Sequence, residues 1–101
     1  TVGAGGATNT ASSQYSTVGG GKQNTASGCS SFVGGGCYNY SLSAYSSIVG
    51  GRFNTSSGIY STVVGGYSGR NLAQYSTIYG GCCNTIRSTA SATSNVLYIV
   101  P

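Results

Sequence analysis

The sequence predicts an all-β fold, a parallel β-solenoid (β-roll) of about six stacked 15-residue coils. Three observations indicate this fold: asparagine recurs at every fifteenth position, a glycine pair recurs with the same period, and short stretches between the glycines alternate inward and outward residue types. A unit of this length is too short to bury a core alone. Neighbouring units must therefore stack and satisfy one another's backbone hydrogen bonds.

The asparagine column sets the register of the repeat. Its members are Asn9, Asn24, Asn39, Asn54 and Asn84, and the single interruption is Gly69. We expect these asparagines to form an internal ladder in which each amide bonds the next. The alternative is a turn residue in the left-handed backbone region, which asparagine and glycine both tolerate.

Each unit contains two short alternating stretches between glycine turns, each about four or five residues long, and both are typical of strands. Each strand should pair in parallel with its copy in the next coil. If Val18 points inward, the period of two places Ser16 inward as well, with Ala26 and Asn24 inward on the opposite strand. The core then holds one β-branched residue per coil, in the column Val18, Val33, Ile48, Val63 and Ile78.

Two outer surfaces follow from the same alternation. The more regular one carries tyrosine with threonine or serine and predicts an assembly or ligand face, with the members Tyr15, Thr17, Tyr45, Ser47, Tyr60, Thr62, Tyr75 and Thr77. The second is an alternative ice-binding face, with the members Thr10, Ser12, Thr25, Ser27, Thr55 and Ser57. The residues that interrupt this second face are Tyr40, Leu42, Arg70, Leu72 and Arg87.

The pattern divides the chain into a solenoid over residues 1–85 and an atypical segment over 86–101. Terminal repeats of solenoids depart from the pattern because they cover an open end. We expect this segment to be a C-terminal cap or a docking strand, formed by Val96, Leu97, Tyr98, Ile99 and Val100. This apolar run is far shorter than the roughly 20 residues that cross a bilayer, so no membrane insertion is predicted.

Composition argues against an enzyme and against cofactors. The chain has four basic residues and no Asp, Glu or His, so carboxylate pairs, hydrolase triads and aspartate-based calcium sites are excluded. Gly19-Gly20-Gly21-Lys22 lacks the spacing and the following helix of a phosphate-binding loop and predicts a tight corner. Four scattered charges predict no nucleic-acid partner, and nothing predicts a small-molecule substrate.

The four cysteines leave three alternatives open: free thiols, a disulfide that includes one between chains, or a metal site. Cys37 and Cys82 share a column three coils apart, about 14 Å, which exceeds the reach of a disulfide. Cys82 and Cys83 are adjacent, and strand alternation predicts that their side chains point to opposite faces.

The stretches Asn24-Thr25-Ala26-Ser27-Gly28 and Ser31-Phe32-Val33-Gly34-Gly35-Gly36 resemble repeats of trimeric autotransporter adhesin heads and of phage and viral tail fibres. They are also similar to the β-rolls of grass ice-recrystallisation-inhibition proteins. Either resemblance covers about residues 1–85 and implies a left-handed coil. The first implies a structural or adhesive protein that assembles as a trimer, extracellular or at a cell or virion surface. The second implies a monomeric ice-binding protein. End-to-end assembly into a filament is predicted separately, because an uncapped solenoid end is an exposed strand edge that recruits further strands.

Overall fold

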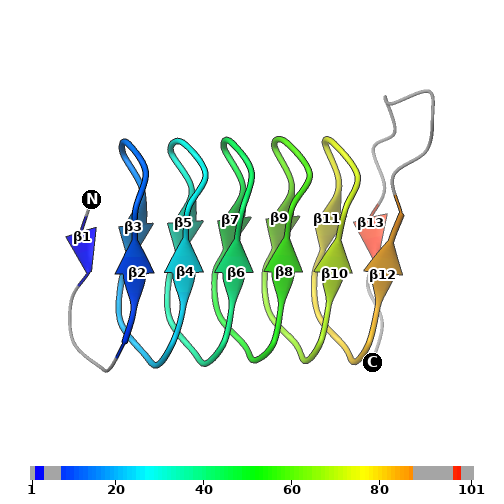
Figure 1. The fold of residues 1–101 in the computed structure, drawn as a ribbon. Coiled ribbons are helices and arrows are strands. Elements are labelled where there is room, and N and C mark those ends of the chain that lie inside the picture. Colours follow the sequence, from blue (N-terminus) through cyan, green and yellow to red (C-terminus); the bar gives the residue numbers. More distant parts are fainter. Residues whose placement is uncertain (1, 4–7, 88–96, 99–101) are drawn as a thin grey trace.

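The chain is a flat, all-β slab. The computed structural model describes residues 2–3, 8–87 and 97–98, and every regular element among them is a short β-strand (Figure 1). The principal extents are 36 × 29 × 12 Å. The predicted fold class, a parallel β-solenoid of stacked 15-residue coils, is confirmed; the span from Asn9 to Asn84 makes five complete turns, with partial turns beyond it.

Two parallel sheets form the broad faces of the slab. The seven-stranded sheet consists of β1 (Val2–Gly3), β3 (Thr17–Val18), β5 (Phe32–Val33), β7 (Ser47–Ile48), β9 (Thr62–Val63), β11 (Thr77–Ile78) and β13 (Leu97–Tyr98). The six-stranded sheet consists of β2 (Thr10–Ala11), β4 (Thr25–Ala26), β6 (Tyr40–Ser41), β8 (Thr55–Ser56), β10 (Arg70–Asn71) and β12 (Thr85–Ile86). Each pair is parallel, and from β1 to β12 the paired residues are one full repeat apart, as in Thr25 with Tyr40.

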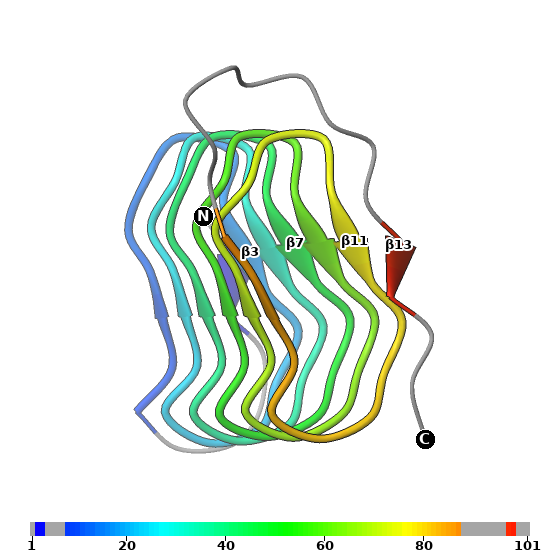
Figure 2. The same ribbon diagram turned by 90° about the vertical axis from the view of Figure 1, so that its right-hand side faces the viewer.

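The coil is left-handed. In Figure 1 the chain rises through the strands of the six-stranded sheet in front and descends through the seven-stranded sheet behind, while it advances toward the C-terminus. The view along the axis in Figure 2 shows the same winding. This hand is the one that the resemblance implies, and it is opposite to the general preference of parallel crossovers.

Each strand is only two residues long, shorter than predicted, because sharp corners follow one another closely. Two residues per coil that are not glycine have a positive φ: the tyrosine column, as in Tyr45 (φ 57), and the residue before each asparagine, as in Tyr38 (φ 56). The left-handed region costs an L-residue about 1–2 kcal/mol. Inter-coil backbone bonds offset that cost, for example from the Tyr45 amide to the Cys29 carbonyl at 2.9 Å.

The apolar core is one residue wide. It consists of the predicted column Val18, Val33, Ile48, Val63 and Ile78, joined by Ala26, Ala73 and Ile86. Each buried Val or Ile contributes about 1.5–3 kcal/mol. Because each coil has only one such residue in this column, buried polar groups must complete the interior. Serine fills much of it, and Ser41 bonds Ser46 across the coil at 2.6 Å, as Ser56 bonds Ser61.

A ladder of buried asparagines links successive coils. Asn24, Asn39 and Asn54 are fully buried, and none has a positive φ, so the alternative of a left-handed turn residue is wrong. One bond of the predicted amide chain is present, from Asn24 Nδ2 to Asn9 Oδ1 at 3.3 Å, but most bonds of the ladder differ from it. Each Oδ1 accepts the backbone N–H of the next member, and each Nδ2 donates to two corner carbonyls, which for Asn39 are those of Gly35 and Gly51, both at 2.9 Å.

At Gly69 the ladder loses its amide side chain but keeps the hydrogen bond to the preceding coil. The Gly69 amide still donates to Asn54 Oδ1 at 2.8 Å. The missing amide side chain is replaced two positions later by buried Asn71, whose Nδ2 donates to the carbonyls of Thr62 and Ser76, both at 3.0 Å. Sequence reasoning missed this exchange, although Asn71 stands in a column otherwise occupied by Ala, Ser and Ile.

The C-terminal strand docks on this same chain. β13 pairs with β11 through Thr77 with Leu97 and Ile78 with Tyr98, so the partners are further apart in sequence than in the regular repeat. The regular register extends through β12, since Arg70 pairs with Thr85. The other predicted docking residues, Val96, Ile99 and Val100, lie outside the described residues.

Candidate functional surfaces

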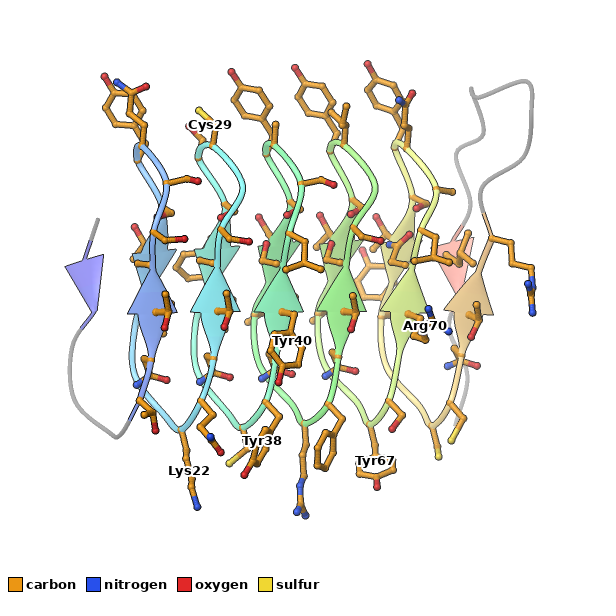
Figure 3. All side chains as sticks on the ribbon, in the orientation of Figure 1. Lys22, Cys29, Tyr38, Tyr40, Tyr67 and Arg70 are labelled. Atoms are coloured by element: carbon orange, nitrogen blue, oxygen red, sulfur yellow. The ribbon has the colours of Figure 1, made fainter. Side chains whose placement is uncertain are left out.

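The tyrosines lie along one narrow edge of the slab, called here the tyrosine edge: Tyr15, Ser30, Tyr45, Tyr60 and Tyr75. Their positive φ places them in the corner before the seven-stranded sheet, and Cys29, which precedes Ser30, marks this edge in Figure 3. Rings on adjacent coils are nearly parallel, with centroids 4.9 Å apart for Tyr45 and Tyr60 and 5.1 Å apart for Tyr60 and Tyr75. The coil spacing therefore matches offset aromatic stacking.

Ser30 interrupts this stack. Its φ of 56° matches that of the tyrosines, so the corner is unchanged and only the ring is missing. Tyr15, on the far side of the gap, is 71% exposed, compared with 48% for Tyr60 inside the stack. None of the five residues of the tyrosine edge is charged, so the edge offers contacts through rings and hydroxyls, with the exposed Cys29 thiol beside Ser30.

The predicted assembly face divides into two surfaces in the structure. Thr17, Ser47, Thr62 and Thr77 lie on strands of the seven-stranded sheet, where they are half-buried, whereas the tyrosines lie at the corner beside that sheet. The sheet surface is regular except at Phe32, which is exposed. Alternation correctly gives outward side chains for both sets, but it does not reveal that a corner separates them.

The predicted ice-binding face lies on the six-stranded sheet. Thr10, Thr25 and Thr55 are on its strands, and Ser12, Ser27 and Ser57 follow the strands directly. Tyr40 and Arg70 stand out from this sheet in Figure 3 and interrupt the threonine column. The longest uninterrupted run of threonine on this sheet is the pair Thr10 and Thr25.

The opposite narrow edge combines basic, aromatic and thiol side chains. Its backbone is a column of parallel bridges through Lys22, Cys37, Arg52, Tyr67 and Cys82. Beside it, the rings of Tyr38 and Phe53 stack at 5.0 Å, and the Arg52 guanidinium lies 5.0 Å from the Phe53 ring centroid. Figure 3 shows Lys22, Tyr38 and Tyr67 along this edge. Sequence analysis did not identify the cluster, although large side chains recur before the asparagines of the middle coils.

The adjacent thiols lie on this edge as well. Cys82 Sγ and Cys83 Sγ are 2.6 Å apart and exposed, so the prediction that they point to opposite faces is wrong. Cys83 has a φ of 64°, and this left-handed corner brings both side chains to the outside. The hydrogen bond with Cys83 raises the pKa of the Cys82 thiol above its ordinary value.

Both sheets end in strands with one partner each. Among the described strands, β2 pairs only with β4 and β12 only with β10, while β1 and β13 terminate the other sheet. Over residues 2–3, 8–87 and 97–98, no group of three or more Cys, His, Asp or Glu side chains is arranged to hold a metal ion. The same part of the chain contains no helix long and apolar enough to cross a membrane.

The stacked coils and the internal asparagine ladder define a parallel β-solenoid built from tandem 15-residue repeats. No protein-family model matches the chain, and no curated protein matches it in sequence.

Proposed function

We propose that this chain is a non-enzymatic structural or adhesive β-solenoid that assembles with copies of itself outside the cell, at a cell or virion surface. Each copy adds further coils to the end of the next copy and so extends the solenoid into a filament. The resemblance of the repeat to adhesin heads and tail fibres supports this class of function.

The observation that carries the proposal is that the two ends of the six-stranded sheet have matching period and polarity. The Leu72 amide donates to the Ile86 carbonyl at 2.9 Å, and the Ser12 amide donates to the Ala26 carbonyl at 3.1 Å. By the same pattern, the Arg87 amide points beyond β12 and the Ala11 carbonyl points beyond β2. If a second copy begins one coil beyond β12, the Arg87 amide of the first copy can donate to the Ala11 carbonyl of the second.

An exposed strand edge recruits other strands, and head-to-tail contacts that do not close into a ring produce open filaments. Uniform positive charge opposes this association, because the chain has a formal net charge of +4 and no acidic residue to pair with a neighbouring copy. Added salt screens that repulsion. Assembly should therefore increase with ionic strength, whereas an assembly held by salt bridges would weaken.

Electron microscopy and sedimentation of the purified chain test the proposal. We expect fibres one slab wide at moderate salt. Arg87→Pro removes the outward-pointing N–H and should shorten the fibres severely, whereas the matched variant Arg87→Ala removes the same charge, keeps the N–H and should preserve them. A chain that stays monomeric at all salt and protein concentrations would overturn the proposal.

A closed trimer through the tyrosine edge is the other form of self-association that the sequence predicts. It would sediment as one species of three chains, unaffected by Arg87→Pro. Substitution of Tyr45, Tyr60 and Tyr75 by serine would return it to monomers, whereas end-to-end fibres would survive this change.

Ice binding is the second candidate function. It is favoured by the flat seven-stranded sheet, on which Thr62 and Thr77 lie in register on adjacent strands. Recrystallisation and thermal-hysteresis assays on dilute monomer test it. Activity that is lost on Thr62→Leu but kept on Thr55→Leu would assign ice binding to this sheet rather than to the six-stranded one.

A further inference from the structure

The adjacent thiols of Cys82 and Cys83 form a distinct chemical site. Their sulfur atoms are 2.6 Å apart, closer than two sulfurs in simple van der Waals contact, and both side chains are exposed. The other two cysteines are remote from this pair. Cys29 lies on the opposite edge, and Cys37 is separated from Cys82 by the coils of Arg52 and Tyr67.

The backbone of the corner produces this proximity. The Cys83 amide donates to the Tyr67 carbonyl at 2.8 Å, and the Tyr67 amide donates to the Gly81 carbonyl at 2.9 Å, which fixes the corner against the preceding coil. Adjacent side chains also converge at the equivalent corner two coils earlier, where Arg52 lies over the Phe53 ring. Convergence therefore occurs at a second corner and does not require two cysteines.

We propose that Cys82 and Cys83 are a redox-active modification site that closes reversibly to a vicinal disulfide by exchange with a small disulfide such as oxidised glutathione. One thiol loses its proton and attacks the small disulfide, forming a mixed disulfide and releasing one molecule of reduced glutathione. The second thiol then displaces the other glutathione, and the Cys82–Cys83 bond forms. In total, two thiols are oxidised, one small disulfide is reduced, and the two protons leave on the two released thiols.

Geometry makes this bond a reversible one and not a structural staple. Adjacent Cα atoms are about 3.8 Å apart across a trans peptide, shorter than the separation of about 4.4–6.8 Å usual for disulfides. The resulting strain favours reduction. The bond also closes no chain loop, so it contributes almost nothing through the entropy of the unfolded state. Its role is to respond to the surrounding thiol–disulfide balance at an exposed corner.

The rate of closure should depend on pH. The thiolate is the attacking species, and the hydrogen bond between the two thiols raises the pKa of Cys82. Attack by Cys82 is therefore slower at neutral pH than attack by an unperturbed thiol, and it accelerates as the pH rises.

The test uses the full chain with Cys29→Ser and Cys37→Ser, so that only the adjacent pair remains. After incubation with oxidised glutathione, intact mass spectrometry should show the loss of two hydrogen atoms and no retained glutathione, with no covalent dimer. The matched control adds Cys83→Ser and should retain one glutathione, because no second thiol can displace it. Excess reduced glutathione should restore both thiols in the pair variant.

Two results would overturn the proposal: stable glutathione adducts on the pair variant, or disulfide-linked dimers in place of the internal ring. A cysteine pair introduced at the same corner of another coil tests whether the corner backbone alone is sufficient for closure. Lys22→Cys with Gln23→Cys, placed in a chain whose own cysteines are all serine, occupies the equivalent corner and should close in the same way. Circular dichroism of each variant verifies that the β-fold is retained.

Discussion

The Oδ1 atom of buried Asn39 accepts the backbone N–H of Asn54 at 3.0 Å, so the side chain of one coil completes the backbone bonding of the next. The same side chain donates to the carbonyls of Gly35 and Gly51. One amide thus joins three backbone groups of successive coils. In a core with one β-branched residue per coil, this bonding makes the stacking register specific.

Removal of this amide should be costly. Asn39→Ala leaves the Asn54 N–H and the Gly35 carbonyl without a partner, while the Gly51 carbonyl keeps its bond from the Cys37 N–H. An unpaired buried polar group costs about 1–3 kcal/mol, so we expect a loss of about 2 kcal/mol or more. Urea unfolding followed by circular dichroism measures it. Asn84→Ala is the matched control, because Asn84 is only half-buried, and we expect a loss of about 1 kcal/mol. Equal losses at the two positions would contradict a ladder that depends on burial.

The two glycines of each corner should respond very differently to a methyl group. Gly36 has a φ of 91°, and a Cβ there would lie 2.1 Å from the Gly51 carbonyl oxygen, whereas a Cβ on Gly35 meets nothing within 4 Å. Gly36→Ala should therefore destabilise by at least about 2 kcal/mol, and Gly35→Ala by less than about 0.5 kcal/mol. Thermal unfolding of the two variants gives the comparison, and similar melting temperatures would contradict it.

The sequence predicts the solenoid well because the same residue types recur at a constant spacing of 15 residues, with few interruptions. The 15-residue period of the asparagine column and the inward Val or Ile of each coil require vertical alignment, whatever the local backbone geometry. The corners could not be predicted in the same way. Tyr45 and Cys83 have a positive φ without being Gly, Asn or Asp, so no residue preference signals the bend.

The surface features that depend on these corners are therefore missed or misplaced by sequence alone. Alternation assigns the tyrosines to the same face as the threonines, and the adjacent thiols to opposite faces. Backbone hydrogen bonds between coils, such as that from the Cys83 amide to the Tyr67 carbonyl, impose the left-handed conformation. These bonds exist only after the coils have stacked. Ser30 stands in the column of the tyrosines, which indicates that these residues share one backbone conformation. The period does not reveal the dihedral angles of that conformation.

The gap in the tyrosine edge offers a test of stacking. Ser30→Tyr should complete the column, because Ser30 has the same corner conformation as Tyr15 and Tyr45. New stacked pairs contribute about 0.5–1.5 kcal/mol each, so thermal stability should rise. Ser30→Ala is the control and should change stability little. A destabilised Ser30→Tyr variant would show that the corner does not accept a ring there.

Folding stability should be nearly independent of pH between about pH 4 and pH 8, because Asp, Glu and His, the side chains that ordinarily titrate in this range, are all absent. At higher pH, folding stability should fall as the pH rises. Cys82 has a raised pKa in the folded chain, so its contribution is present below the ordinary pKa of a thiol and is lost as the pH rises through the folded value. Urea midpoints measured across this range provide the test, and acid unfolding above about pH 4 would contradict it.

The exchange at Gly69 and Asn71 predicts strong coupling between two positions. A Cβ at Gly69 would lie 3.1 Å from Asn54 Oδ1 and 3.7 Å from Ile78 Cδ1, while Asn71 already bonds the Thr62 and Ser76 carbonyls. Gly69→Asn alone should overpack this coil, and Asn71→Ser alone should leave the Thr62 carbonyl without its side-chain donor, while the Ser76 carbonyl keeps the Thr62 N–H. Each single variant should lose about 1–3 kcal/mol.

The double variant restores the arrangement of the coil before it, in which Asn54 is followed two positions later by Ser56. Its loss should be smaller than the sum of the two single losses by about 0.5–3 kcal/mol, the range for residues that share one network. Urea unfolding of all four chains completes the cycle. Additive losses would mean that the two positions act independently and that Asn71 does not replace the missing ladder side chain. Recovery in the double variant would show that each coil needs one buried amide, held at either of two positions.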